Sequence, residues 1–144
     1  MCSILKKRKL VIFKLYTDGA SRGNPGHASI GVYICDSENN SIKEISKYIG
    51  KQTNNYAEYS ALIEGLKACL DNNITSINVF MDSELIVKQL KGEYKVKNEN
   101  LIPLYQQVTC LKSKFTQITF KHVQRENNKK ADKLANIALD KYLE

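Results

Sequence analysis

Four acidic residues stand where a folded chain can gather them: Asp18, Glu58, Asp82 and Asp132. Asp18 follows an apolar stretch and precedes a glycine-rich turn, and Asp82 directly follows the stretch Ile77–Met81. Each alone has a structural explanation, because aspartate forms turns and acidic residues suit the first turns of helices. Together, four carboxylates would repel one another, and divalent cations would relieve that repulsion. Hard oxygen ligands select Mg²⁺ or Mn²⁺, and two such ions about 3.5–4 Å apart suit phosphodiester hydrolysis.

The first of these residues follows an expected strand meander. Residues 10–17 are rich in β-branched and aromatic types, which favours a central strand. The turn chemistry of Ser21–Gly26 breaks the pattern, and residues 28–35 and 42–49 then predict two further strands around the polar turn Asp36–Ser41. Three strands joined by short turns imply an antiparallel arrangement.

Helices and strands alternate over the rest of the chain. We expect helices over 55–70, 83–91, 101–111 and 128–143, and strands over 75–81 and 116–123. The order is βββ-α-β-α-α-β-α, and the helical crossovers imply parallel neighbours. The sequence therefore predicts an α/β fold with a five-stranded mixed sheet flanked by helices, its first three strands antiparallel. The first and fourth strands as neighbours would place Asp18 beside Asp82.

Four segments that carry the acidic residues resemble the signature segments of type 1 ribonuclease H, in that family's order. They are YTDGASRGNPG (16–26), TNNYAEYSALIEGLKA (53–68), FMDSELIVKQL (80–90) and HVQRENNKKADKLANIAL (122–139). The resemblance spans nearly the whole chain and implies a ribonuclease H-like fold, with residues 1–144 as a single catalytic domain. It implies an endonuclease that hydrolyses the RNA strand of RNA–DNA hybrids and leaves 5′-phosphate and 3′-hydroxyl ends. Its cofactors would be two Mg²⁺ ions, with Mn²⁺ as a substitute.

The resemblance also implies catalytic roles. Asp18 would bridge both ions, and Asp132 would join it on the ion that activates the attacking water. Glu58 and Asp82 would complete the site around the ion that stabilises the leaving 3′ oxygen. His122, ten residues before Asp132, matches the family's loop histidine that assists proton transfer or product departure. The alternative for His122 is a structural role at a strand end.

Four residues match substrate contacts of the family, and a fifth stands at such a position but differs in type. Asn24 and Asn55 match asparagines of the minor groove, where an amide can both donate and accept. Thr53 matches a threonine of the phosphate pocket on the DNA side, and Asn98 matches an asparagine of that pocket. The structural alternatives are a tight turn for Asn24 and a helix N-cap for Thr53. Glu84 departs from the family, where glutamine is common, because an ionised carboxylate accepts hydrogen bonds but cannot donate them.

The charge distribution suits a protein that binds a polyanion. The formal net charge is +7, and residues 1–50 and 101–144 each carry 8 basic and 4 acidic side chains, against 6 and 7 in residues 51–100. A basic surface around a carboxylate-rich zone favours nucleic acid as partner. Only Lys91–Asn98 fill the interval where well-known bacterial members carry a basic, tryptophan-containing handle. Binding would therefore rely on the basic residues of the C-terminal third and depend strongly on salt.

Several protein classes are disfavoured. No apolar run is long enough to span a bilayer, and no signal peptide follows Lys6–Lys9, which we interpret as a solvated lead-in to the first strand. We therefore expect a cytoplasmic monomer without an obligate protein partner. Cys2, Cys35, Cys69 and Cys110 form no CxxC pair, so free thiols are expected rather than a zinc site.

Three other interpretations stay open. One is a hybrid- or duplex-binding module that has lost catalysis, although all four acidic residues are present. Another is a different nuclease of the same broad fold, such as a resolvase, an integrase or an exonuclease. A detached retroelement domain would share the ribonuclease H chemistry and differ only in origin.

Overall fold

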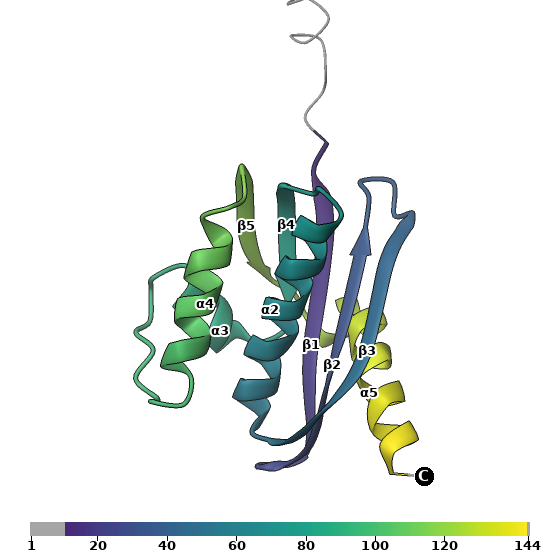
Figure 1. The fold of residues 1–144 in the computed structure, drawn as a ribbon, viewed down its shortest axis with the longest axis vertical. Helices are drawn as coiled ribbons and strands as arrows, with labels where there is room; N and C mark the ends of the chain where they lie inside the picture. Colours follow the sequence, from purple (N-terminus) through teal and green to yellow (C-terminus); the bar gives the residue numbers. More distant parts are fainter. Residues whose placement is uncertain (1–10, 144) are drawn as a thin grey trace, which may run out of the picture.

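A computed structural model describes residues 11–143 of the chain. In this part, five strands form one mixed sheet in the order β3-β2-β1-β4-β5 (Figure 1). The strands are β1 Phe13–Gly23, β2 Gly26–Cys35, β3 Ser41–Gln52, β4 Ser76–Met81 and β5 Gln117–His122. The helices are α2 Asn54–Asp71, α3 Glu84–Leu90, α4 Ile102–Lys112 and α5 Lys129–Tyr142, with a 3₁₀ turn η1 at Arg125–Asn127.

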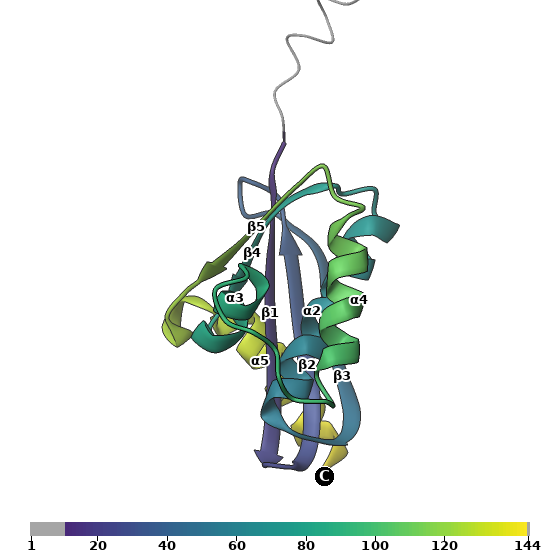
Figure 2. The same ribbon diagram turned by 90° about the vertical axis from the view of Figure 1, so that its left-hand side faces the viewer.

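The sheet topology confirms the predicted α/β architecture. β1 pairs antiparallel with β2, and β2 pairs antiparallel with β3. The helical crossovers place β4 parallel to β1 and β5 parallel to β4. α2 and α4 pack on one face of the sheet, and α5 lies against β1, β2 and β3 on the other (Figure 2). Residues 91–101, all of them described, contain no helix between α3 and α4, as expected of a chain without the handle.

β1 is longer than the sequence predicts. It continues through Asp18 to Gly23, because β2 pairs with it residue for residue over this length. Its parallel pairing with β4 stops at Tyr16. Asp18 therefore lies inside a strand rather than after one, at the point where the neighbouring β4 has ended. The expected turn Ser21–Gly26 shrinks to Asn24 and Pro25.

The hydrophobic core lies between the sheet and α2. Leu15, Leu62 and Val79 are fully buried there, and burying such a side chain stabilises the fold by about 1.5–3 kcal/mol. The Tyr59 hydroxyl donates to Gln89 Oε1 at 2.7 Å, which joins α2 to α3. No helix in residues 11–143 has both the length and the apolar character needed to cross a membrane.

The predictions about thiols and the basic lead-in are tested only in part. Cys35, Cys69 and Cys110 are free thiols, the first two buried and the third exposed. Cys2 and Lys6–Lys9 lie outside the described residues.

Two glycines let helices approach the sheet more closely than any side chain would allow. A Cβ at Gly19 would lie 2.2 Å from the carbonyl carbon of Ala57 in α2. A Cβ at Gly31 would lie 2.0 Å from the carbonyl oxygen of Ala131 in α5. Real Cβ atoms do not approach backbone so closely. These two contacts fix how far Glu58, next to Ala57, and Asp132, next to Ala131, reach toward β1.

Candidate active site

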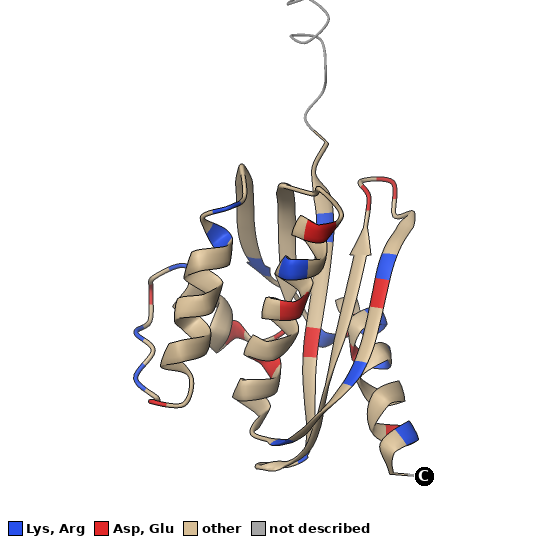
Figure 3. Cartoon of the chain, in the orientation of Figure 1, with Lys and Arg blue, Asp and Glu red and all other residues tan. Residues whose placement is uncertain are grey.

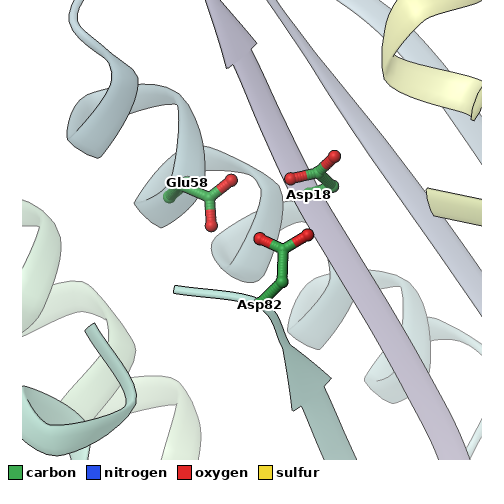
Figure 4. A group of neighbouring side chains, drawn as sticks. All are labelled: Asp18, Glu58 and Asp82. Atoms are coloured by element: carbon green, nitrogen blue, oxygen red, sulfur yellow. The ribbon is translucent and has the colours of Figure 1, made fainter. Parts of the chain in front are cut away.

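Three of the four predicted carboxylates meet beside the end of β4. Asp18 comes from β1, Glu58 from α2, and Asp82 directly follows β4. One oxygen of each lies within 4.8 Å of one oxygen of the other two, and Figure 4 shows the three side chains pointing toward one another. Asp18 and Glu58 are each only 6% exposed. Because Asp82 is half-buried, the group is a largely buried carboxylate cluster.

Glu58 is held by its helix and by β1. Thr53 caps α2 by accepting a hydrogen bond from the Tyr56 N–H at 3.2 Å, which places Glu58 in the second turn. Glu58 Oε1 accepts from the Gly19 N–H at 2.5 Å. Its other oxygen, Oε2, is buried without a hydrogen-bond partner in the described part of the chain. An unpartnered buried carboxylate oxygen is costly unless a cation or donor satisfies it.

The cluster is electrostatically unfavourable without a cation. Burial, followed by the charges of Glu58 and Asp82 and by hydrogen bonds to Glu58 and Asp132, raises the pKa of Asp18. Burial, and to a smaller degree the charge of Asp82, also raises the pKa of Glu58, against the nearby Asp18 carboxyl group and the Gly19 N–H, which lower it. Both groups therefore bind protons more readily than in water. Oxygen ligands, crowding and the unpartnered Oε2 together fit a divalent cation such as Mg²⁺.

Asp132 faces the same space from the opposite side of the sheet. It lies in the first turn of α5. Its Oδ1 is 3.5 Å from Arg125 Nη2 and accepts from Asn136 Nδ2 at 3.3 Å. Within residues 11–143 it is not part of the group that shares the 4.8 Å spacing. Asp132 nevertheless lines the same cleft as the other three carboxylates.

That cleft has a volume of about 460 Å³ and contains all four predicted acidic residues in its walls. Its other polar lining residues include Ser21, Arg22, Asn54, Asn55, Arg125 and Asn136. Most of these were not predicted from the sequence. The cleft is open to solvent.

Asn128 is a site residue that sequence reasoning missed. It is 1% exposed and immediately precedes α5. Its Nδ2 donates to the Thr17 carbonyl at 3.0 Å and lies 3.4 Å from Asp82 Oδ2. It thus links the elements that carry Asp18, Asp82 and Asp132. One signal was available, because Asn128 and Asn136 lie four residues on either side of Asp132 and such spacing shares a helical face.

His122 and Glu84 lie outside the lining of the cleft. His122 is exposed and ends β5, paired with Met81, the residue before Asp82. Glu84 is exposed at the start of α3, with an ion pair of 2.9 Å to Lys88 Nζ. Lys88, and to a lesser degree His122, lowers the pKa of Glu84. Glu84 therefore stays ionised and can only accept hydrogen bonds.

Three of the other predicted substrate contacts gather at the start of α2, whereas the fourth, Asn98, lies in a different loop. Asn55 lines the cleft. Asn24 Oδ1 accepts from the Asn54 N–H at 3.0 Å and fastens the β1–β2 turn to the start of α2. Thr53 is the N-cap of that helix, so the structural alternatives for both residues hold. Asn98 lies in the exposed loop before α4 and accepts from the backbone two residues on. Their roles toward a substrate stay predictions.

Comparisons with known proteins identify the family. A family model described as reverse transcriptase-like matches residues 16–138. A ribonuclease H of Clostridium botulinum is 33% identical over 145 residues, which cover 89% of this chain and 95% of that protein. This chain belongs to the ribonuclease H family. A solved RNase H1 isolated from compost, in complex with an RNA/DNA hybrid, is 43% identical with a TM-score of 0.86, covering 92% of this chain and 99% of that one. The resemblance to type 1 ribonuclease H is thereby confirmed.

Some ribonuclease H relatives are much longer than this chain. A bifunctional protein of Mycobacterium tuberculosis is 44% identical over 124 residues, which are 85% of this chain but 34% of that protein. The chain thus spans about a third of the length of the mycobacterial relatives it matches.

Proposed function

We propose that this chain is an endonuclease that hydrolyses the RNA strand of RNA–DNA hybrids, with residues 1–144 acting as one catalytic domain. The observation that carries the proposal is the buried cluster of Asp18, Glu58 and Asp82, with Asp132 in the wall of the same cleft. A relative of 43% identity was solved with an RNA/DNA hybrid, which supports the choice of substrate. A monomeric state and a cytoplasmic location stay predictions from the sequence.

The four carboxylates would hold two Mg²⁺ ions, or Mn²⁺ in their place. When bound, such ions supply an activated water and neutralise charge on the phosphate and the leaving oxygen. Departure of the 3′ oxygen leaves 3′-hydroxyl and 5′-phosphate ends.

The chain's own contribution is to fix its ligands before the substrate arrives. The Gly19 N–H orients Glu58, the Asn128 amide orients Asp82, and Asn136 orients Asp132. Preorganised charges cost no rearrangement during the reaction.

Residues around the cleft would select the hybrid. The Asn55 amide can both donate to and accept from the minor groove, where 2′-hydroxyls distinguish RNA from DNA. Thr53 and Asn98 would contact the DNA strand at its phosphates, and Asn24 would add a minor-groove contact through its amide nitrogen. Glu84 would accept a hydrogen bond from a 2′-hydroxyl or an amino group. His122, at the end of the strand beside Asp82, would assist proton transfer or product departure.

One assay tests the proposal. A labelled hybrid, duplex RNA and duplex DNA are each incubated with the full chain and with Asp18→Asn, in Mg²⁺ and in EDTA. We expect cleavage of the RNA in the hybrid only, only with the metal and only by the wild type. Cleavage that survives EDTA or the substitution would refute the two-metal mechanism. Equal cleavage of duplex RNA would refute hybrid selectivity.

A further inference from the structure

The cleft extends well past the carboxylates, along the second half of β1. Its far end is lined by Ser21 and Arg22 from β1 and by Asn136 and Leu139 from α5. Arg22 and Arg125 are the two basic side chains in its lining. Arg125 lies 3.5 Å from Asp132 and so belongs to the carboxylate end. Arg22 belongs to the far end, whose residues have no role in the proposed mechanism.

β1 and α5 run alongside each other between these two ends. Asp18 and Arg22 are four residues apart on a strand, so they share a face and lie about 13 Å apart along it. Asp132 and Asp140 are eight residues apart on α5, a rise of about 12 Å. The matched spacings place Asp132 toward Asp18 at one end and Asp140 against Arg22 at the other.

The ion pair at the far end is easily replaced. Arg22 Nη2 lies 2.5 Å from Asp140 Oδ1, and the two side chains are 41% and 66% exposed. Ion pairs this exposed contribute about 0–1 kcal/mol to stability. Within residues 11–143 the Arg22 side chain makes no other hydrogen bond, so most of its five N–H donors are available.

We propose that Arg22 binds a backbone phosphate of the nucleic-acid strand in the cleft. In the absence of nucleic acid, Asp140 forms an ion pair with the Arg22 guanidinium group, and the phosphate takes the place of the Asp140 carboxylate on binding. The planar fork of a guanidinium matches two phosphate oxygens, and Asp140 presents the same charge and the same kind of oxygen. The spacing from Asp18 makes the ligand a phosphate a few nucleotides from the one that is cut. The positive charge of Arg22 also offsets the repulsion between a polyanion and the carboxylate cluster. This inference rests on the proposed function.

The competing explanation is that Arg22 only fastens α5 to β1. The two explanations differ in what they expect of Asp140. If the ion pair only stabilises the packing of α5 on β1, removing either residue should have the same effect on stability and on hybrid binding. If Arg22 is a phosphate ligand, removing Asp140 frees it and leaves hybrid binding unchanged or tighter.

The test compares Arg22→Ala, Arg22→Lys and Asp140→Asn with Lys43→Ala, which removes one exposed positive charge from β3 far from the cleft. Hybrid affinity is measured by fluorescence anisotropy in EDTA, in the Asp18→Asn background and over a series of salt concentrations. KM and kcat are measured with Mg²⁺ in the wild-type background, and melting temperatures in both.

We expect Arg22→Ala to raise Kd and KM by roughly tenfold, the size typical of hydrogen bonds to a charged group. It should also flatten the slope of log Kd against log salt by about 0.9, the loss of one phosphate contact. Arg22→Lys should fall between wild type and Arg22→Ala, and Asp140→Asn should bind at least as tightly as wild type. Lys43→Ala should change neither Kd nor slope.

Two results would overturn the inference. Equal weakening of binding by Arg22→Ala and Asp140→Asn, with equal losses of melting temperature, would show a fastener. If Arg22→Ala has the same Kd and salt slope as Lys43→Ala while the wild type cuts the hybrid, Arg22 does not bind a phosphate. The proposed function would then still hold. A wild type that neither binds nor cuts the hybrid would refute both.

Discussion

At the residue scale, Asp18 and Glu58 are carboxyl groups held away from water and beside a third acid, Asp82. Such a group is stable only if it keeps its proton or gains a cation. The fold therefore stores unfavourable electrostatic energy that a bound cation would release, which is a known feature of functional sites. Stability without metal should depend on pH in a way that identifies this cluster.

The first prediction concerns that dependence. Because the pKa of Asp18 and of Glu58 is raised in the folded state, their contribution to stability is complete at low pH and is lost as the pH rises through the folded values. In EDTA, the free energy of unfolding should fall between about pH 5 and pH 8, by up to about 1.4 kcal/mol per pH unit for each proton released. Asp18→Asn should reduce this slope and exceed the wild type in stability at pH 8. Urea unfolding at several pH values measures both.

A matched control separates this effect from any loss of negative charge. Asp36 is an exposed turn carboxylate whose pKa is lowered by hydrogen bonds from Asn40, so its contribution has the opposite sign. Asp36→Asn should gain nothing at pH 8. Added Mg²⁺ should raise the melting temperature of the wild type and of Asp36→Asn, and much less that of Asp18→Asn. Equal slopes for all three proteins would contradict the account.

The second prediction concerns Asn128. Asn128→Ala leaves the buried Thr17 carbonyl without its donor, which should cost about 1–3 kcal/mol of stability. It also frees Asp82, so kcat should fall by roughly tenfold or more while KM changes little. Asn128→Asp keeps the shape but places a second carboxylate beside Asp82 and should be worse at pH 8 than at pH 5. A change in KM alone would assign Asn128 to substrate binding instead.

At the scale of the elements, much could be predicted because local pattern and connection rules agree. Alternating and helical periodicities predicted, in order, the five strands and four α-helices of residues 11–143. The helical crossovers predicted parallel neighbours, and β4 does lie beside β1. The end of β1 could not be predicted in this way. Residues 18–23 contain two glycines and small polar side chains, which have low strand propensity. Pairing with β2 overrides that preference, and it depends on contacts that no local window contains.

The same limit applies to the site. Asp18 and Asp82 were expected to be close because their strands are neighbours. Asn128 could not be placed, because its partner Thr17 is 111 residues away. Arg22 was hidden inside a segment that the sequence assigns to a turn, although the structure shows it as part of β1. Residue type and spacing indicate chemistry, whereas hydrogen-bond partners come only from the fold.

The third prediction concerns the contact between α5 and the sheet. Gly31→Ala forces a Cβ against the Ala131 carbonyl, and overpacking of this kind typically costs about 1–3 kcal/mol. A shift of α5 would relieve this clash, and it would also move Asp132, which α5 carries. The loss of activity should therefore be larger than the loss of folded protein accounts for. Gly65→Ala is the control, because the nearest atoms to its Cβ are side-chain methyl groups of Leu15 and Thr17 at 2.9–3.2 Å. These can shift without moving α5, and alanine favours a helix by about 1 kcal/mol. Chemical denaturation and kcat distinguish the two variants. Equal effects would show that close approach of α5 is not required.

At the scale of the whole molecule, an acidic cleft lies within a basic protein. Basic residues are distributed over β3, α5 and the loop between α3 and α4, while acidic ones include positions on β1 and α2 (Figure 3). A polyanion is thus attracted by the surface and repelled by the carboxylates of the cleft, and a cation bound at these carboxylates would reduce that repulsion. Without a handle, attraction depends on scattered lysines and arginines rather than on one dedicated module.

The last prediction follows from that arrangement. Each phosphate neutralised by the protein contributes about −0.9 to the slope of log affinity against log salt. If four phosphates are contacted, raising the salt from 50 to 200 mM at fixed Mg²⁺ should raise KM by about a hundredfold. kcat should change little, because Asp18 and Glu58 are buried and Asp82 and Asp132 are half-buried, so that salt screens them less than the exposed surface charges. A KM that stays constant over this range would mean that the basic surface does not bind the hybrid, and that the cleft alone supplies the affinity.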